Sequence, residues 1–375
     1  MNRLFILLLS LAAFAFAPAA AAVNFTLSQS AVSNLFTGAL DLQITGLTSG
    51  EPVLLQKFID ANNDGIVDPG EPLVGQFKLI EGQVSSIVGV RNRNVPGDAD
   101  ETANGVINET FDFSDPKDFA HHVAPYLFRV SSPTTNFLPL VRAFAVTNST
   151  LGQAVTGTVS SAPNAFIILL KPSADGGELF AGGIANAAGM FSISCPPGNY
   201  QVLATKSGMV TDFGAAPTVT VGAGLSTNVT LSLAPANRTI SGTLTNSATG
   251  GVLAGVQVRL QSTNELFALG YSDDQGNFSI GVVAGEWSPE VEETALTALG
   301  YVAPEQLSSI NTTVAGVTGL VLSFQPATAL FHGSFVVGGT STGIAAMPFS
   351  ARIQNNSVSA SGLTDANGNF TLGVL

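Results

Sequence analysis

Short runs of alternating apolar and polar residues recur along almost the whole chain, bounded by glycine, proline, asparagine or aspartate. The pattern is clearest in TVTVGAGLSTNVTLSL at 218–233 and NTTVAGVTGLVLSF at 311–324. A period of two places every second side chain on the same face of a strand. A short helix fits the pattern near 116–125. We therefore expect an all-β protein of short strands joined by tight turns.

Three segments of the chain can be aligned as internal repeats. They open with VTGTV at 155–159, ISGTL at 240–244 and FHGSF at 331–335. Each then reaches a turn ending in Gly-x-Phe, with an Asn or Asp five residues before the phenylalanine (NAAGMF, DDQGNF and DANGNF). The Asx side chain bonds the turn backbone and the glycine takes a positive φ, so the turn delivers the phenylalanine into a strand. A period of roughly 85–90 residues is too long for a solenoid and suits one small β-sandwich per repeat.

The two longer copies share further landmarks. An aromatic residue follows nine positions after the phenylalanine, at Tyr200 and Trp287, and KSGM or ALGYV comes later. This set of motifs resembles carboxypeptidase regulatory-like domains, and it is also similar to starch-binding-like and collagen-adhesin B-type repeats. The resemblance implies tandem Ig-like or transthyretin-like β-sandwich domains of a bacterial secreted protein. The carboxypeptidase in the family name refers to the enzyme that such accessory modules accompany.

The repeats divide the chain into units that we expect to be strung like beads, with each full repeat folding on its own. The third copy stops soon after its phenylalanine, so we predict that it is truncated. The expected units are a signal peptide (1–22), an N-terminal β-sandwich (23–150), the first repeat (151–236), the second repeat (237–327) and the truncated third repeat (328–375).

The N-terminus indicates secretion. Residues 1–22 combine Arg3, an apolar run and the small-residue ending Ala20-Ala21-Ala22, which predicts a cleaved signal peptide. The apolar run is shorter than the roughly 20 residues of a membrane span, and no later run is longer, so we expect no transmembrane segment in the mature chain. One cysteine, Cys195, gives no disulfide framework. A net charge of −13 without any basic cluster argues against nucleic-acid binding.

One loop has the oxygen spacing of a calcium site. The stretch DANNDGIVDPGE at 60–71 places six potential ligands at positions 1, 3, 5, 7, 9 and 12, and Gly65 at position 6 allows the sharp turn. The ligands are the side chains of Asp60, Asn62, Asp64, Asp68 and Glu71 and the backbone carbonyl of Ile66.

The flanks of this loop differ from those of a helix–loop–helix site. VLLQKFI at 53–59 and LVGQFKLI at 73–80 are strand-like, and Pro69, Gly70 and Pro72 stand where an exit helix would begin. We therefore expect a structural Ca²⁺ clip in a β-hairpin. The alternative is an acidic turn stabilised by its Asx side chains without an ion.

No catalytic constellation is evident. A zinc peptidase needs His and Glu ligands at close spacing, and no Glu lies within four residues of His121, His122 or His332. GTSTG at 339–343 matches the G-x-S-x-G motif, but it aligns with the turn SATGG at 247–251, so Ser341 is not expected to be a nucleophile. We expect a protein that is not an enzyme.

Two functions remain. The first is a secreted or cell-surface structural spacer, adhesin or assembly scaffold with surface proteins as partners. The second is a carbohydrate-binding module array with a polysaccharide partner, in which Tyr200, Trp287 and Tyr301 would stack on sugar rings. Tyr200 and Trp287 occupy a regular strand position of the repeat, which favours core packing for both.

Overall fold

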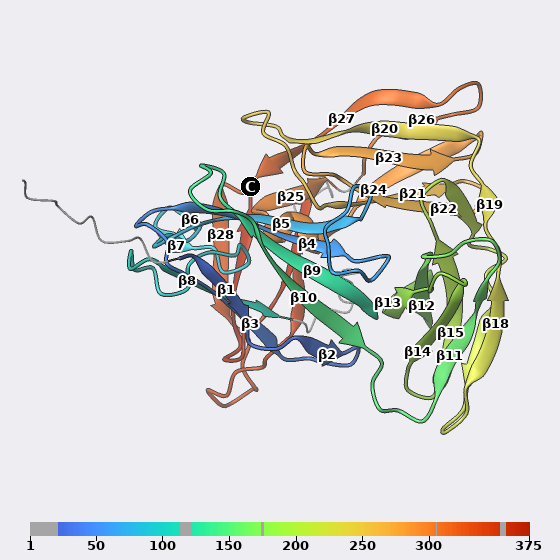
Figure 1. Ribbon diagram of the computed structural model, residues 1–375, viewed down its shortest axis with the longest axis horizontal. Coiled ribbons are helices and arrows are strands. Elements are labelled where there is room, and N and C mark those ends of the chain that lie inside the picture. Colours follow the sequence, from blue (N-terminus) through green and yellow to red (C-terminus); the bar gives the residue numbers. More distant parts are fainter. Residues whose placement is uncertain (1–21, 113–121, 174–175, 305, 353–357) are drawn as a thin grey trace, which may run out of the picture.

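The computed structural model describes residues 22–112, 122–173, 176–304, 306–352 and 358–375. This part of the chain contains 31 strands and one short helix. The strands form tandem two-sheet units, so the predicted all-β class is confirmed (Figure 1). The predicted signal peptide lies outside the described residues, apart from residue 22. Most of the helix expected near 116–125 does so too, and its last two residues begin a strand instead.

The N-terminal unit is a sandwich of a three-stranded and a five-stranded sheet, in the orders β1-β3-β8 and β2-β10-β9-β4-β5. The sequence ALDLQIT of β3 alternates between exposed and buried positions, with Leu40, Leu42 and Ile44 buried in the core between the sheets. The strands are β1 (Asn24–Leu27), β2 (Ala31–Ser33), β3 (Ala39–Thr45), β4 (Pro52–Ile59), β5 (Leu73–Ile80), β8 (Val106–Asp112), β9 (Ala124–Ser131) and β10 (Leu140–Thr147), with a separate ribbon of β6 (Ser86–Ile87) and β7 (Val90–Arg91).

The first repeat is a second sandwich, with sheets β14-β11-β18 and β13-β12-β15-β17 around its own core. Tyr200 is fully buried there, which confirms that it is a core residue. The strands are β11 (Ala154–Val159), β12 (Phe166–Ser173), β13 (Gly176–Ile184), β14 (Met190–Ser194), β15 (Gly198–Thr205), β16 (Met209–Asp212), β17 (Thr218–Val221) and β18 (Thr227–Leu231).

The second repeat provides most of two six-stranded sheets, β19-β16-β22-β21-β24-β26 and β23-β20-β27-β25-β30-β29. Trp287 and Phe278 lie in its core. The elements are β20 (Arg238–Asn246), β21 (Gln257–Ser262), β22 (Leu266–Tyr271), β23 (Asn277–Val282), β24 (Glu286–Val291), α1 (Glu293–Ala298), β25 (Tyr301–Pro304), β26 (Ile310–Asn311) and β27 (Val317–Pro326). The short strand β19 (Ala234–Pro235) comes from the end of the first repeat. The helix α1 was not expected from the sequence, because six residues are too few to show a helical period.

The third copy contributes β28 (Ala329–Ser334), β29 (Pro348–Arg352), β30 (Val358–Leu363) and β31 (Asn369–Val374). Its register confirms the repeat alignment. In every copy the opening glycine faces the turn phenylalanine across an antiparallel pair, as Gly157–Phe191, Gly242–Phe278 and Gly333–Phe370. The three copies thus share the pairing of the opening strand with the strand that follows the turn.

The predicted turn chemistry is present in all three copies. Each Asx side chain accepts hydrogen bonds from the backbone N–H groups two and four residues later, at 2.8–3.0 Å. Each turn glycine has a positive φ of 74–77°. The Asx residues are Asn186, Asp273 and Asp365, so an asparagine at the first site preserves the turn.

The units are joined by strand pairing, which the sequence pattern did not indicate. The strand β16 of the first repeat pairs with β22 of the second, and β25 of the second pairs with β30 of the third. These are equivalent strands in successive copies, so one joint is used twice. Because each joint extends a sheet across a repeat boundary, successive repeats contact each other through paired edge strands.

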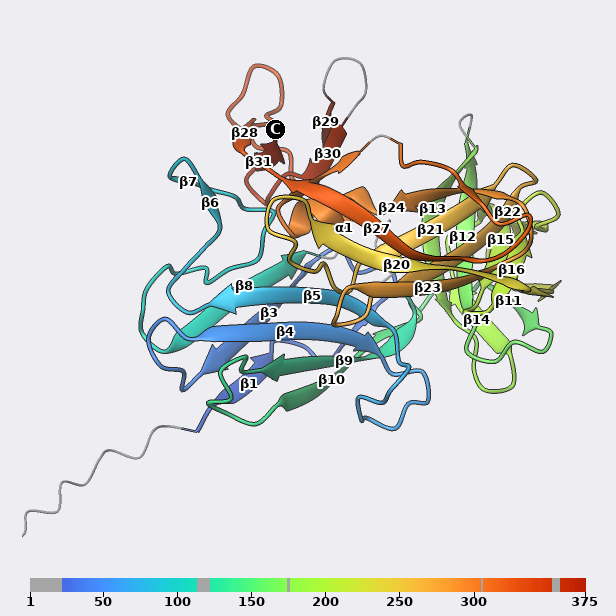
Figure 2. The same ribbon diagram turned by 90° about the horizontal axis from the view of Figure 1, so that it is seen from above.

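The chain also folds back onto its N-terminal unit. In Figures 1 and 2 the last strands lie beside the N-terminal sheets rather than at the far end of a row. The hydroxyl of Thr371 accepts a bond from the Arg93 N–H at 2.7 Å, and the amide of Asn94 donates to the Thr371 carbonyl at 2.5 Å. At the other end of the unit, a bridge joins Val123 to Gly183 of β13. The repeats therefore curve around the N-terminal sandwich.

Candidate functional site

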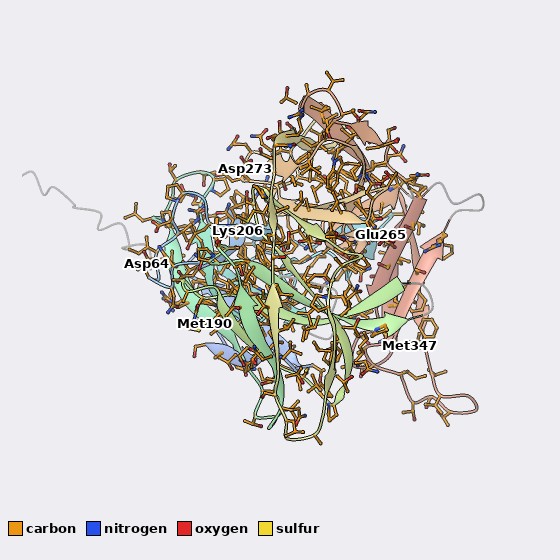
Figure 3. The ribbon with its side chains drawn as sticks, turned by 90° about the vertical axis from the view of Figure 1, so that its right-hand side faces the viewer. Asp64, Met190, Lys206, Glu265, Asp273 and Met347 are labelled. Carbon is orange, nitrogen blue, oxygen red and sulfur yellow. The ribbon has the colours of Figure 1, made fainter. Side chains whose placement is uncertain are left out.

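The calcium-like loop connects β4 and β5, two antiparallel neighbours, so the predicted hairpin is present. Asp60 at its first position is only 3% exposed. Its two carboxylate oxygens accept bonds from the N–H groups of Asp64 and Gly65, at 3.1 and 2.9 Å. Gly65 has a φ of 78°, as the sharp turn requires. Asp64 lies on the outside of the molecule (Figure 3).

The remaining ligand candidates are held within the loop. The side-chain amide of Asn62 donates to a carboxylate oxygen of Asp64 and to one of Asp68, both at 3.0 Å. Glu71 accepts from the N–H groups of Ala61 and Asp68, each at 3.1 Å. The side chain of Ile66 is exposed, so the predicted ligand of this residue is its backbone carbonyl. The loop thus brings the predicted oxygens to one hairpin end.

The ionised carboxylates of the loop repel one another. Burial, and beyond it repulsion from Asp60 and Asp68, raises the pKa of Glu71. In the structure the side-chain amide of Asn62 bridges the carboxylates of Asp64 and Asp68. Within the part of the chain that the structure describes, no three or more His, Cys, Asp or Glu side chains are grouped closely enough to hold a metal ion.

The aromatic candidates for sugar stacking do not form a binding platform. Tyr200 and Trp287 are fully buried, and each donates a hydrogen bond from its polar end to a backbone carbonyl, at 2.8 and 3.0 Å. Tyr301 is half-buried and its hydroxyl accepts a bond from Asn246. Two of the three rings are therefore part of repeat cores, so the carbohydrate hypothesis loses two of the three residues on which it depended.

The residues considered for catalysis are scattered. His122 is buried at the junction with the first repeat, His332 is exposed on β28, and His121 lies outside the described residues. Ser341 is exposed in the connection between β28 and β29, two strands, rather than at a strand-to-helix turn. Cys195 is fully buried, and burial raises the pKa of its thiol.

The structure contains a cleft of about 580 Å³ that the sequence did not suggest. Three units line it: the N-terminal sheets through Lys57 and Phe111, the second repeat through Thr294 of α1, and the third copy through Ser361 and Phe370. The wall mixes aromatic rings with single polar groups. Residues this far apart in sequence meet only through the folding-back of the chain, so no local motif could have revealed the cleft.

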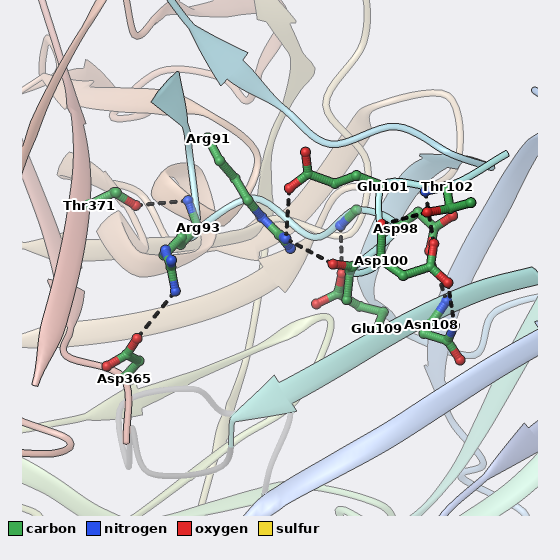
Figure 4. Close-up of polar contacts among 12 residues, drawn as sticks. Arg91, Arg93, Asp98, Asp100, Glu101, Thr102, Asn108, Glu109, Asp365 and Thr371 are labelled. Atoms are coloured by element: carbon green, nitrogen blue, oxygen red, sulfur yellow. Dashed lines mark hydrogen bonds and ion pairs between the residues drawn. The ribbon is translucent and has the colours of Figure 1, made fainter. Parts of the chain in front are cut away.

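A network of carboxylates braces the loops beside this cleft (Figure 4). Asp98, fully buried, accepts from the N–H groups of Gly82 and Asn108 at 2.7 and 3.1 Å. Glu109 on β8 accepts from the Gly97 N–H at 2.6 Å. Burial raises the pKa of Glu109 to about 7, with the nearby Asp98 adding to the effect and Arg91 opposing it. These acids satisfy backbone donors of the segments around Gly82 and Gly97 and of strand β8, which is a structural role.

The comparisons with known proteins give only distant similarities. No protein-family model matches the chain, and no curated protein matches it. Among solved structures, the Bacillus anthracis TIE protein aligns at 11% identity over 93% of this chain and 66% of that one, with a TM-score of 0.22. A streptococcal ancillary pilin aligns at 12% identity over 74% and 92%, with a TM-score of 0.21. The minor pilin GBS52 of Streptococcus agalactiae aligns at 15% identity over 46% and 96%, with a TM-score of 0.20.

The described part of the chain contains one short helix, α1. The described residues include no helix of sufficient length and apolar character to span a bilayer.

Proposed function

We propose that this chain is a secreted or cell-surface protein without enzymatic activity, which serves as a structural spacer, adhesin or assembly scaffold. The observation that supports this most is the repeated joint between units. The pairs β16–β22 and β25–β30 carry hydrogen-bonded sheets across both repeat boundaries. A sheet that continues from unit to unit fixes their relative orientation, and a fixed orientation is what a scaffold outside the cell needs.

Two further features support this proposal. The buried acids bind backbone N–H groups of loops, so the polar interior is used to hold irregular segments in place. The units also close on themselves through Thr371 and Arg93, which adds a contact at the far end of the chain. Both features stiffen an assembly of small sandwiches, each of which has limited apolar core of its own.

The test uses the organism that carries the gene. Antibodies raised against residues 23–375 should label intact, unpermeabilised cells or bind protein in the culture medium. Deletion of the gene should reduce cell adhesion or the assembly of a surface structure, and the wild-type gene should restore it. Antigen confined to the cytoplasm would contradict the proposal, and so would unchanged adhesion and unchanged surface structure in the deletion strain.

We further propose that the hairpin loop at 60–71 binds calcium as a structural clip. Four carboxylates within twelve residues repel one another, and the raised pKa of Glu71 reflects that repulsion after burial. A bound cation would take over the place of the Asn62 amide between Asp64 and Asp68. Extracellular modules of this kind bind calcium at about 10⁻⁴–10⁻³ M, so millimolar calcium would occupy the loop.

The calcium proposal is tested by calorimetry and thermal melting of residues 23–375. Calcium at about ten times its dissociation constant should stabilise the protein by about 1.4 kcal/mol relative to chelator, and magnesium should do less. Glu71→Gln and Asp64→Asn should abolish the increase in melting temperature. Asp273→Asn is the matched control, because Asp273 stabilises a turn with the same Asx bonding outside the loop. A wild-type melt that calcium leaves unchanged would reduce the loop to an acidic turn.

A further inference from the structure

The cleft between the units lies where the two N-terminal sheets meet the second repeat. Phe111 on β8 comes from one of these sheets, and Phe77 on β5 and Phe128 on β9 come from the other. The rings of Phe77 and Phe111 are 5.7 Å apart between their centroids. The helix α1 lines another side. Small-molecule sites are often found at such junctions of domains, and a volume of about 580 Å³ is in their usual range.

One polar group of this wall has no partner among the described residues. Thr297 on α1 is 4% exposed, and its side-chain hydroxyl is buried without a hydrogen bond. A buried hydroxyl without a partner raises the free energy of the empty protein, and a bound molecule that supplies the bond removes this penalty. A threonine hydroxyl both donates and accepts, so a hydroxyl or a carbonyl group would match it.

Two acids in the wall are neutralised by ion pairs. Arg93 and Asp365 both line the cleft and are paired with each other at 3.3 Å (Figure 4). Glu292, which precedes α1, is paired with Arg259 at 3.0 Å. These side chains therefore already have counter-charges within the protein.

The two other charged residues of the wall, Lys57 and Glu109, are also held by the protein. The ammonium group of Lys57 lies 4.3 Å from the centroid of the Tyr126 ring. The carboxylate of Glu109 accepts bonds from the N–H groups of Gly97 and Thr110, at 2.6 and 3.0 Å. An ionic ligand would leave water for a wall whose charges are already matched, which is unfavourable. The wall therefore favours an uncharged ligand.

The cleft is independent of the outer strands of the third copy. That copy lines the cleft with the end of β30, the turn that follows and the start of β31. In the second repeat, β27 and β24 pair with β20 and β21, the equivalents of β28 and β29. Within the described residues neither β28 nor β29 lines the cleft. Strands added beside them would lie two strands away from its wall.

We propose that the cleft binds an uncharged aromatic molecule of about two to three rings, and that Thr297 holds the one hydroxyl or carbonyl group of this molecule. The phenylalanine rings on the N-terminal sheets would pack against its rings. This inference goes beyond the assembly role proposed above, and neither depends on the other.

The test uses purified residues 23–375 and four probes that share one double ring and differ in a single substituent. They are 2-naphthol, naphthalene, 2-naphthoate and 2-naphthylmethylammonium, all at neutral pH. Binding is measured by isothermal titration calorimetry, and hydrogen exchange is followed at α1.

Four variants locate the site. Thr297→Val removes the hydroxyl and keeps the shape of the side chain, whereas Thr297→Ser keeps the hydroxyl. Ala298→Phe, at another residue of the wall, fills the space. Thr313→Val is the matched control, because Thr313 is exposed in a turn of the same repeat. Thermal melting of each variant checks that it is folded.

The expected result is saturable binding of 2-naphthol with slowed exchange at α1. Naphthalene should bind about five- to tenfold more weakly, because it lacks the hydrogen bond to Thr297. The two ions should bind weaker than 2-naphthol by about tenfold or more. Thr297→Val should lower the affinity for 2-naphthol to that for naphthalene and leave naphthalene binding unchanged. Thr297→Ser and Thr313→Val should bind 2-naphthol as the wild type does, and Ala298→Phe should bind neither neutral probe.

Three results would overturn the inference. One is an absence of saturable binding of 2-naphthol. Another is equal affinity of the wild type and Thr297→Val for 2-naphthol, or undiminished binding by a folded Ala298→Phe protein. The third is binding of either ion as tight as that of 2-naphthol, since the site would then recognise a charge.

Discussion

The stability of the N-terminal unit should fall as pH rises through the titration of one buried acid. Glu109 is 8% exposed on β8, and burial raises its pKa from 4.5 to about 7. Its carboxylate accepts hydrogen bonds from the N–H groups of Gly97 and Thr110, which do not fully offset the loss of water. The folded state therefore favours the protonated acid more than the unfolded state does.

The sign and size follow from linkage. Between about pH 4.5 and pH 7 the folded chain holds a proton at Glu109 that the unfolded chain has released. Stability from this group is present below pH 4.5 and is lost as pH rises through 7. The difference of about 2.5 between the two pKa values corresponds to about 3 kcal/mol of unfolding free energy. Glu109→Gln, which resembles the protonated acid in shape and charge, should remove this loss.

The measurement is hydrogen exchange in urea at pH 5 and pH 8, corrected for intrinsic rates, at amides of residues 92–110. The stability of Glu109→Gln relative to the wild type should be greater at pH 8 than at pH 5 by about 2.5 kcal/mol, because a small part of the effect is already present at pH 5. Glu101→Gln is the control, since Glu101 lies in the loop that precedes β8, and its exposed side chain forms a 3.4 Å ion pair with Arg91. Parallel pH curves for wild type and Glu109→Gln would refute the assignment of a raised pKa to this carboxyl.

Three further predictions concern the repeats and their joints. Phe278→Ala should destabilise the second repeat by about 3–5 kcal/mol, because the ring is 3% exposed and lies in the core of that repeat. Unfolding is followed by the fluorescence of Trp287, which belongs to the same core. A loss of stability below about 1 kcal/mol would contradict the placement of Phe278 in the core. Thr371→Val should remove the acceptor of the Arg93 N–H and speed exchange of that amide, whereas unchanged exchange would mean that the contact does not hold the units together. Cys195 should resist thiol reagents in the native protein and react once the chain is unfolded, and rapid native labelling would place the thiol at the surface.

Much of the local structure could be predicted from the sequence, because it depends on neighbouring residues. The turns at Asn186, Asp273 and Asp365 form as expected, since an Asx side chain bonds N–H groups two and four positions away whatever the rest of the chain does. The alternation of ALDLQIT in β3 is local in the same way, and it places Leu40 and Leu42 on the core face. The loop at 60–71 was expected in a hairpin, and its prolines excluded the helix as predicted.

What the tertiary structure alone decided is how these pieces meet. The pairs β16–β22 and β25–β30 leave no mark on the local pattern, because a strand that pairs within a repeat and one that pairs across a boundary share the same alternation. The raised pKa of Glu109 likewise arises from burial under a loop that folding brings over it.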